Sequence, residues 1–202
     1  MAKRAPWLKP LVFALSLLPL AWLVWQALFG SLGVNPVETL NRFLGDWALR
    51  FLLIALAVTP ARQLSGWSAL GSLRRMLGLF AFFYVYLHVS SYVGLDQFFD
   101  WQALWKDVLK RRYITVGMTA LLLLIPLAVT STDAMVRRLG GRRWRALHRA
   151  VYVIAPLAAL HFWMMVKADH SRPMLYAGIV AILLGYRLAV KVPGFLGRRG
   201  TP

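Results

Sequence analysis

Three of the four histidines in this sequence lie within apolar stretches, where ionisable side chains are uncommon. His88 lies in one stretch, and His148 and His161 lie together in another. No carboxylate lies near any of them in the sequence to form an ion pair. Because a neutral imidazole is a common metal ligand, these histidines indicate a bound metal cofactor, with haem as the first candidate.

The composition indicates the environment in which such a cofactor would be held. Hydrophobic residues make up 59% of the 202 positions, charged residues make up 15%, and the mean hydropathy is +0.60. One soluble core cannot bury that much apolar surface, so the chain belongs in a membrane. The absence of cysteine excludes disulfide bonds, thiolate-bound zinc, iron–sulfur clusters and a cysteine nucleophile.

Six stretches are long enough to cross a hydrocarbon layer as helices, which takes about 20 residues each. The predicted helices cover residues 10–29, 44–60, 76–95, 113–131, 148–167 and 173–192. The sequence therefore predicts an all-α integral membrane bundle of six transmembrane helices, forming a single domain over residues 1–202. The second helix carries Asp46 and Arg50, whose i, i+4 spacing predicts an ion pair near the membrane surface.

Basic residues are concentrated on one side of the predicted bundle. With the N-terminus in the cytoplasm, that side holds 16 of the 24 lysines and arginines, while six of the seven acids lie on the opposite side. The positive-inside rule then predicts that both termini are cytoplasmic. We interpret the net charge of +17 as a topology signal and a contact with anionic membrane lipid, and not as a nucleic-acid interface.

Two of the histidines lie at matching depth. His88 is 12 residues past the cytoplasmic start of its helix and His161 is 13 residues past the start of its own. At about 1.5 Å per residue, both lie about 18–20 Å into the membrane. Two imidazoles from separate helices can bind one haem iron from opposite sides, an arrangement that suits electron transfer better than oxygen chemistry.

The alternative interpretation is that these histidines only form hydrogen bonds between helices, as single membrane histidines often do. His148 has a further alternative, because it lies between Arg145 and Arg149 at the membrane boundary, where a solvated cation is ordinary. At about 100° per residue, His148 is turned about 140° from His161 around the helix, so the two do not share a face. His170, in a short outer connection, is predicted to be only solvated.

The helix order and the histidine positions resemble the ferric reductase-like transmembrane domain shared by ferric reductases and NADPH oxidases. The features that carry the resemblance are His88 in the third helix and His148 and His161 in the fifth. The similarity covers about residues 10–192. Since the chain has no flavin/NADPH domain, it is most similar to the haem-binding subunits of bacterial periplasmic protein-methionine-sulfoxide reductase systems.

The resemblance implies an electron-transfer subunit, rather than a catalytic one, in the bacterial inner membrane. Electrons would enter on the cytoplasmic side from a quinone pool or a flavin reductase. They would leave to a periplasmic molybdenum-containing partner that reduces methionine sulfoxide in oxidised proteins. The resemblance also implies haem b and FMN as cofactors, although no flavin motif is present in the sequence.

The sequence departs from the NADPH oxidase pattern at one position. In those proteins the third helix carries two histidines that complete two haem sites, whereas here Arg74 lies 14 positions before His88. His88 and His161 therefore account for one haem. An inner haem on His148 would need another ligand, such as Met76, or Arg74 could hold a haem propionate or a flavin phosphate. The sequence is therefore consistent with either one or two bound haems.

Two connections are candidate docking surfaces. Residues 132–147, with Thr132 or Asp133 as an N-cap, would face a cytoplasmic donor or lie on anionic lipid. The segment with Asp96, Asp100, Trp101 and Trp105 would face the outer partner. The competing functions are a self-contained ferric or quinone reductase and a non-redox membrane transporter or assembly factor. Against transport, the predicted helices carry no acid near the membrane centre.

Overall fold

The structure, a computed structural model, describes residues 6–30 and 32–196, and all of its regular elements are helical, as predicted. The long helices in chain order are α1 (Leu8–Leu28), α2 (Pro36–Ser65), α3 (Arg74–Ser91), α4 (Trp101–Lys110), α5 (Arg112–Val129), α6 (Asp133–Leu147), α7 (Val151–Met165) and α8 (Ser171–Leu196). Short turns of other helix types are η1 (Ser68–Ser72), η2 (Tyr92–Asp96) and η3 (His148–Ala150).

Five of these helical segments are long and apolar enough to cross a membrane: α1, α2, α3 with η2, α5 and α8. They correspond to five of the six predicted spans. The second begins earlier than predicted, because the Asn35 side chain accepts a hydrogen bond from the Glu38 N–H and Pro36 occupies the first helical position. It ends at Gly66, whose φ of 67° is a left-handed helix cap.

The structure differs from the prediction around the span predicted at 148–167. Residues His148–Ala150 form the tighter turn η3, and α7 itself has 15 residues, which cover only about 22 Å. The preceding connection, predicted as a loop, is the helix α6, broken at Gly140 with φ 74° and ψ 147°. Of the two predicted N-caps, Thr132 is confirmed, because its hydroxyl accepts a hydrogen bond from the Met135 N–H, whereas Asp133 is the first residue of the helix.

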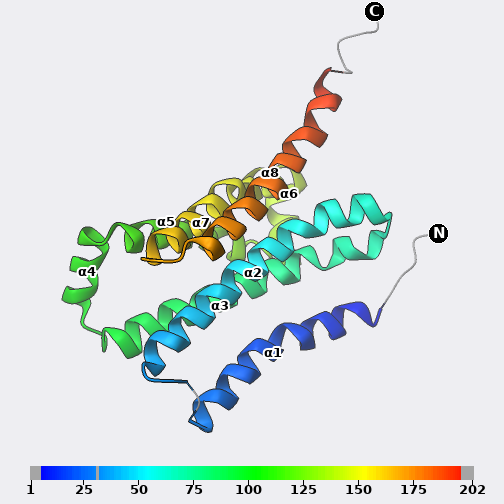
Figure 1. Ribbon diagram of the computed structural model, residues 1–202. Helices are drawn as coiled ribbons and strands as arrows, with labels where there is room; N and C mark the ends of the chain where they lie inside the picture. The colour runs from blue at the N-terminus through cyan, green and yellow to red at the C-terminus, as the bar shows by residue number, and fades with distance from the viewer. Residues whose placement is uncertain (1–5, 31, 197–202) are drawn as a thin grey trace, which may run out of the picture.

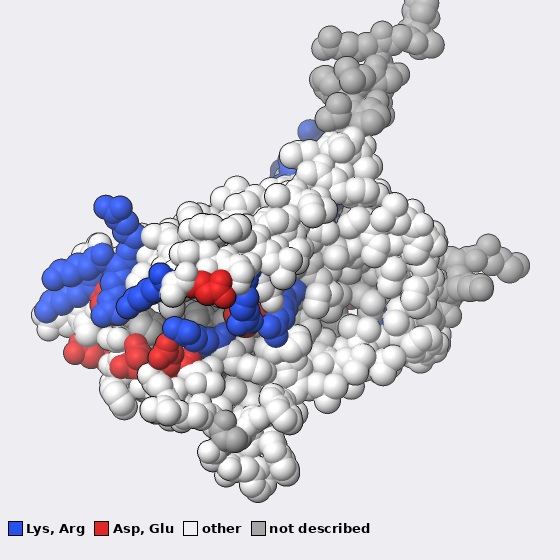
Figure 2. Space-filling view, viewed as in Figure 1, with Lys and Arg blue, Asp and Glu red and all other residues white. Residues whose placement is uncertain are grey.

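The long helices run alternately between two ends of the bundle (Figure 1). One end, called here the α6 end, holds the start of α1, the α2–α3 connection, α6 and the end of α8. The other, the α4 end, holds the end of α1, α4 and the α7–α8 connection. Figure 2 shows charged side chains of both signs gathered at the α4 end.

The α4 end is organised by a short helix and by ion pairs. Asp100 caps α4 by accepting hydrogen bonds from two backbone N–H groups, and both Trp101 and Trp105 are exposed. The predicted pair of Asp46 and Arg50 is confirmed at 3.7 Å, and Arg172 of α8 lies closer to the same carboxylate, at 2.8 Å. The contact of Asp46 with Arg172 joins α2 to α8.

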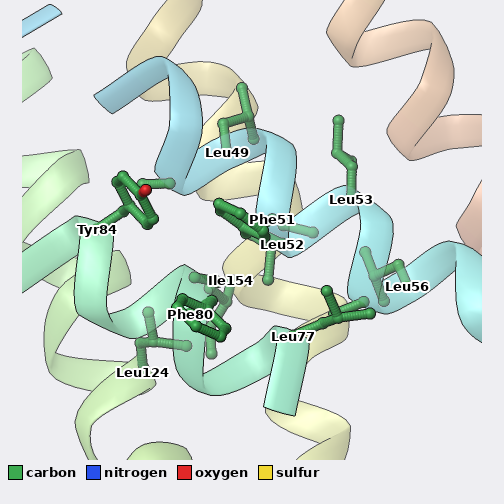
Figure 3. Packing of buried hydrophobic residues seen from close by; sticks show 14 of the residues in the cluster. Leu49, Phe51, Leu52, Leu53, Leu56, Leu77, Phe80, Tyr84, Leu124 and Ile154 are labelled. Atoms are coloured by element: carbon green, nitrogen blue, oxygen red, sulfur yellow. The ribbon is translucent and has the colours of Figure 1, made fainter. Parts of the chain in front are cut away.

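The core lies around α2, which has more buried residues than any other helix of the described chain, and these residues cover more than half of its circumference. Phe51 stacks against Phe80 and Tyr84 of α3, with ring centroids 5.6 and 5.1 Å apart (Figure 3). Ile154 of α7 and Leu124 of α5 extend the same cluster. The packing therefore fixes α3 and α7 relative to one another through α2.

Tyr84 also holds α1 in place. In a regular helix the Leu20 N–H would donate to the Ser16 carbonyl, but the chain carries Pro19 at this point. The Tyr84 hydroxyl instead accepts from the Leu20 N–H at 3.1 Å and donates to the Ser16 carbonyl at 2.9 Å. Since Tyr84 is fully buried, this bridge satisfies two backbone groups of α1 from inside the bundle.

We expect Tyr84→Phe to lower the free energy of unfolding by about 1–3 kcal/mol, because it leaves those two groups without their buried partner. Thermal unfolding in detergent measures the change. Tyr86→Phe is the control, since Tyr86 is on the same helix and is 60% exposed. Equal stability of the two variants would contradict the bridging role.

Candidate functional site

His88 and His161 face each other inside the bundle, as their matching depth predicts. His88 comes from α3 and His161 from α7, and both are partly buried. Their ring centroids are 6.3 Å apart and the ring planes are inclined by 75°. Two helices that are distant in the sequence thus bring two imidazoles to one place.

A backbone carbonyl orients each ring. His88 Nδ1 lies 3.0 Å from the carbonyl oxygen of Asn41 in α2, and His161 Nδ1 lies 2.7 Å from that of Tyr113 in α5. A carbonyl oxygen only accepts, so each Nδ1 must carry a proton. In the neutral ring the lone pair then lies on Nε2, which takes part in no hydrogen bond among the described residues.

Asn41 also holds the end of α3 through hydrogen bonds from its side chain. Its Nδ2 donates to the backbone carbonyl of His88 at 3.2 Å and to the Ser91 hydroxyl at 3.0 Å. The Ser91 hydroxyl in turn donates to the His88 carbonyl. The end of α3 is therefore tied to α2 both through the imidazole and through the backbone.

Both orienting carbonyls become accessible in the same way. Gly45 lies four residues after Asn41, and Gly117 lies four residues after Tyr113. A side chain in a helix leans over the preceding turn, so a glycine at this spacing uncovers the carbonyl. A Cβ on Gly45 would lie 3.2 Å from His88 Nδ1, and one on Gly117 would lie 2.8 Å from His161 Nδ1. Each glycine makes room for its imidazole.

The spacing of the two rings fits a metal ion between them. An imidazole nitrogen lies about 2 Å from a bound metal and about 1 Å from its own ring centroid, so opposed rings have centroids about 6 Å apart. The observed separation is 6.3 Å. Two such nitrogens supply the axial ligands of a haem iron, whose four remaining ligands come from the porphyrin.

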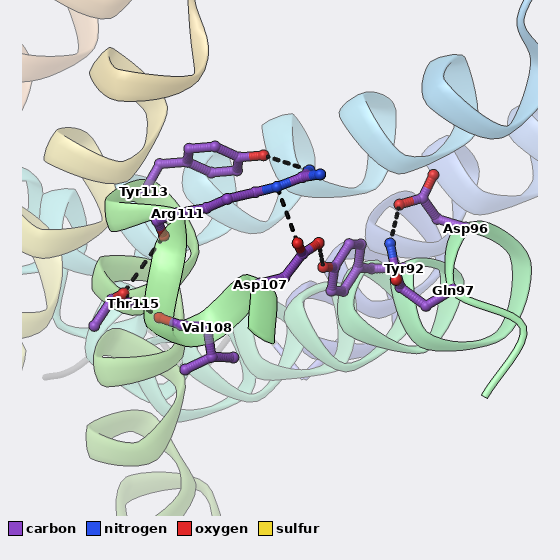
Figure 4. Close-up of polar contacts among 8 residues, drawn as sticks. All are labelled: Tyr92, Asp96, Gln97, Asp107, Val108, Arg111, Tyr113 and Thr115. Atoms are coloured by element: carbon purple, nitrogen blue, oxygen red, sulfur yellow. Dashed lines mark hydrogen bonds and ion pairs between the residues drawn. The ribbon is translucent and has the colours of Figure 1, made fainter. Parts of the chain in front are cut away.

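A polar network at the α4 end supports the Tyr113 side of the site (Figure 4). Arg111 donates to the Tyr113 hydroxyl at 3.2 Å and pairs with Asp107 at 3.0 Å. Asp107 also accepts from the Tyr92 hydroxyl at 2.7 Å. The hydrogen bond to Tyr113 and the charge of Asp107 raise the pKa of Arg111. Because Tyr92 directly follows α3, this network joins the helix of His88 to the start of α5.

His148 lies apart from the pair, near the α6 end. Its Nε2 is 3.2 Å from the Thr130 hydroxyl, and its ring stacks on Trp144 with centroids 3.9 Å apart. The Thr130 hydroxyl donates to the Pro126 carbonyl at 2.6 Å, so it accepts from His148. The proton of a neutral His148 is then on Nε2, the opposite nitrogen from the one protonated in His88 and His161.

The other predicted site residues lie outside the histidine pair. Arg74 is the first residue of α3, at the α6 end, and is exposed. Met76 packs against the apolar core. His170, predicted to be solvated, is half-buried and stacks on Trp163 with centroids 4.8 Å apart.

The sequence interpretation missed the residues that orient the ligands. Asn41 lies before the predicted start of its helix, and Tyr113 contributes a backbone atom, which residue type does not reveal. The available signal was the pair of glycines, Gly45 and Gly117, at the same level as the histidines in helices that otherwise favour larger apolar residues.

Known proteins resemble this chain over most of its length. Residues 44–159 match the family described as "Ferric reductase like transmembrane component". A protein of Rhodospirillum rubrum named "Protein-methionine-sulfoxide reductase heme-binding subunit MsrQ" is 60% identical over 188 residues, covering 93% of this chain and 89% of that protein. A protein of the same name from Caulobacter vibrioides is 51% identical, covering 88% of this chain and 85% of that protein. Another, from Herminiimonas arsenicoxydans, is 52% identical, covering 90% of this chain and 84% of that protein.

We expect Gly117→Ala to displace His161, because the new Cβ would lie 2.8 Å from Nδ1 and 2.9 Å from Cε1 of that ring. Disturbing a group that orients a metal ligand typically weakens metal affinity by about 10–100-fold. Haem per polypeptide in the purified protein measures the effect. Gly78→Ala is the control, since nothing lies within 4 Å of its added Cβ. Full haem content in Gly117→Ala would contradict the steric argument.

Proposed function

Because this chain belongs to the family of ferric reductase-like transmembrane components, and within it to the haem-binding MsrQ subunits, we propose that it is a b-type cytochrome. The observation that carries the proposal is the pair of opposed imidazoles whose Nδ1 atoms are both held by backbone carbonyls. His88 and His161 would be the axial ligands of one haem iron.

In this proposal the protein's own part in the chemistry is to hold the haem and to shield it from water. The carbonyls of Asn41 and Tyr113 fix the proton on Nδ1 of each ring, so that Nε2 of each ring would be available to bind the haem iron. A haem iron with two histidine ligands supplies one-electron transfer and resists added ligands. The apolar helices would limit the access of water to the haem, and the chain needs no catalytic acid, base or nucleophile.

The proposed topology has six spans with both termini in the cytoplasm of a bacterial cell, in its inner membrane. Five spans come from the long helices. The sixth combines η3 with α7, from His148 to Met165, a length of about 27 Å that approaches the hydrocarbon thickness. The α6 end, which carries the excess of basic residues, would be cytoplasmic, and the α4 end would be periplasmic.

Electrons would cross the membrane from the α6 end to the α4 end. The donor would be a quinol or a cytoplasmic flavin reductase, and FMN, implied by the resemblance alone, would belong on the same side. The acceptor would be a periplasmic molybdenum-containing methionine sulfoxide reductase. Its reaction takes two electrons and two protons per sulfoxide and releases methionine and water, so this chain would deliver two electrons in succession.

The surface at the α4 end suits a partner of this kind. Trp101 and Trp105 of α4 are 70% and 65% exposed, and Asp100 and Lys106 neighbour them in the sequence. His88 and His161 both lie toward this end of their helices. An electron would therefore have a short path from the ligated iron to a protein seated on α4.

We expect His88→Ala and His161→Ala each to lose most of the bound haem while the membrane fold is retained. The measurement is the absorption spectrum of the detergent-purified protein before and after reduction, in which the unsubstituted chain should show sharp low-spin b-type bands. His170→Ala is the matched control, because this histidine lies outside the pair.

Full haem content in both variants would refute the ligand assignment. A colourless unsubstituted protein, purified after expression with ample haem, would favour the transporter or assembly-factor alternative. Steady turnover with a small electron acceptor in the absence of any protein partner would favour a self-contained ferric or quinone reductase.

The haem number is tested separately at His148. A second, inner haem would need a nitrogen of His148, whose Nε2 is now bonded to Thr130, and a further ligand such as Met76. If the inner haem exists, His148→Ala should halve the haem per polypeptide and leave the other haem spectrum intact. An unchanged ratio would establish that the pair of His88 and His161 holds the only haem.

A further inference from the structure

The rings of His88 and His161 are crossed rather than parallel, with their planes inclined by 75°. Because Nδ1 of each ring faces a backbone carbonyl, the direction of each ring depends on the position of that carbonyl. The Asn41 carbonyl lies within the long helix α2, whereas Tyr113 lies in the first turn of α5, next to the corner that this helix makes with α4. The position of Tyr113 therefore depends on how that corner is held.

The corner between α4 and α5 is closed by hydrogen bonds on both sides of Arg111, the one residue that separates the two helices. Its carbonyl accepts from the N–H groups of Ile114 and Thr115 at 2.9 and 3.2 Å, which begins α5. The Thr115 hydroxyl donates back to the Val108 carbonyl of α4 (Figure 4). Since the corner is closed in this way, the direction of α4 determines where Tyr113 lies.

Asp107 fixes the direction of α4 against the helix of the other ligand. One of its carboxylate oxygens lies 3.0 Å from Nε of Arg111, and the other accepts from the Tyr92 hydroxyl at 2.7 Å. Tyr92 lies four residues after His88, where the chain widens into the π-helical turn η2, a type of turn that is frequent at functional sites. The Asp107 side chain is only 15% exposed, so little water competes with either contact.

Arg111 carries the link from Asp107 to Tyr113. Its Nη1 donates to the Tyr113 hydroxyl at 3.2 Å while its Nε faces Asp107, so one planar guanidinium spans both groups. The centroid of the Tyr113 ring lies 6.3 Å from that of His161. Tyr113 therefore meets His161 both through its ring and through the carbonyl that faces Nδ1.

We infer that Asp107 and Arg111 are positioning residues for the haem ligands, acting through Tyr113. By joining Tyr92 to Tyr113, they hold the crossing angle of the two imidazoles. This inference rests on the proposed function, because the angle acts on the chemistry only through a shared iron. An imidazole donates its π electrons perpendicular to its ring plane. Crossed rings therefore act on two different d orbitals of the iron and keep their energies similar, whereas parallel rings separate them, so the angle tunes the iron's reduction potential.

The test compares Arg111→Gln with Arg42→Gln in the full-length, haem-loaded protein. Both arginines lie at the α4 end, four residues after an acidic partner, and their side chains are 52% and 66% exposed. The measurement is the electron paramagnetic resonance spectrum of the ferric protein, in which crossed imidazoles give a strongly anisotropic low-spin signal. The largest g value should fall in Arg111→Gln, because loosened rings turn toward parallel, and should stay unchanged in Arg42→Gln.

The haem-free protein supplies a second measurement, nitrogen-15 NMR of the His161 ring. Arg111→Gln should speed the exchange of the Nδ1 proton with water, because the Tyr113 carbonyl is held less firmly, and Arg42→Gln should not. A purely structural role for Arg111 would lower Tm and leave the g value and the exchange rate equal to those of the control.

The inference is overturned if Arg111→Gln and Arg42→Gln agree in both the g value and the exchange rate, whatever their Tm. Should Arg111→Gln fail to fold, Tyr92→Phe takes its place, because it removes one hydroxyl and leaves the pair of Asp107 and Arg111. Its control is Tyr86→Phe, and agreement of these two variants likewise overturns the inference. If the unsubstituted protein shows no low-spin haem, the proposed function fails, and the exchange rate alone decides the positioning role.

Discussion

The site depends on two backbone carbonyls that determine which nitrogen of each imidazole carries the proton. Asn41 and Tyr113 supply these carbonyls from α2 and α5, helices that pack directly against the helices of the two histidines. A carbonyl is already the acceptor of its own helix, but its second lone pair is available when nothing covers it. Gly45 and Gly117, each four residues further on, leave that lone pair uncovered. The same arrangement, a backbone carbonyl left uncovered by a glycine four residues later, thus orients each of the two histidines.

A related constraint shapes the rest of the bundle. A membrane offers no water to backbone groups that prolines or bends release, so neighbouring helices must satisfy them. Tyr84 does this for α1 near Pro19, and Arg187 does it for α2 at Pro60. Both side chains come from other helices, so each irregularity in one helix also fixes the position of another. These bridges and the core around Phe51 hold α3 and α7 in the register that the histidine pair needs.

Much of this architecture follows from hydropathy and helix periodicity. Five spans and the equal depth of His88 and His161 could be predicted, since both depend on residue type and on the rise of a helix. The Asp46–Arg50 pair and the Thr132 N-cap could also be predicted, because each involves residues only three or four positions apart in the sequence. The orienting contacts could not be predicted, because they use backbone atoms of helices that are distant in the sequence. The burial of Arg187 could not be predicted either, because it depends on the packing of α8 against α2.

The most direct measurement of the central claim is pulsed electron paramagnetic resonance of the oxidised protein with nitrogen-15 in its histidines. Two imidazole nitrogens coupled to one low-spin ferric iron are predicted, and both couplings should disappear with the haem in His88→Ala and in His161→Ala. A signal from a single imidazole, or couplings that persist in both variants, would show that the facing rings do not share a metal.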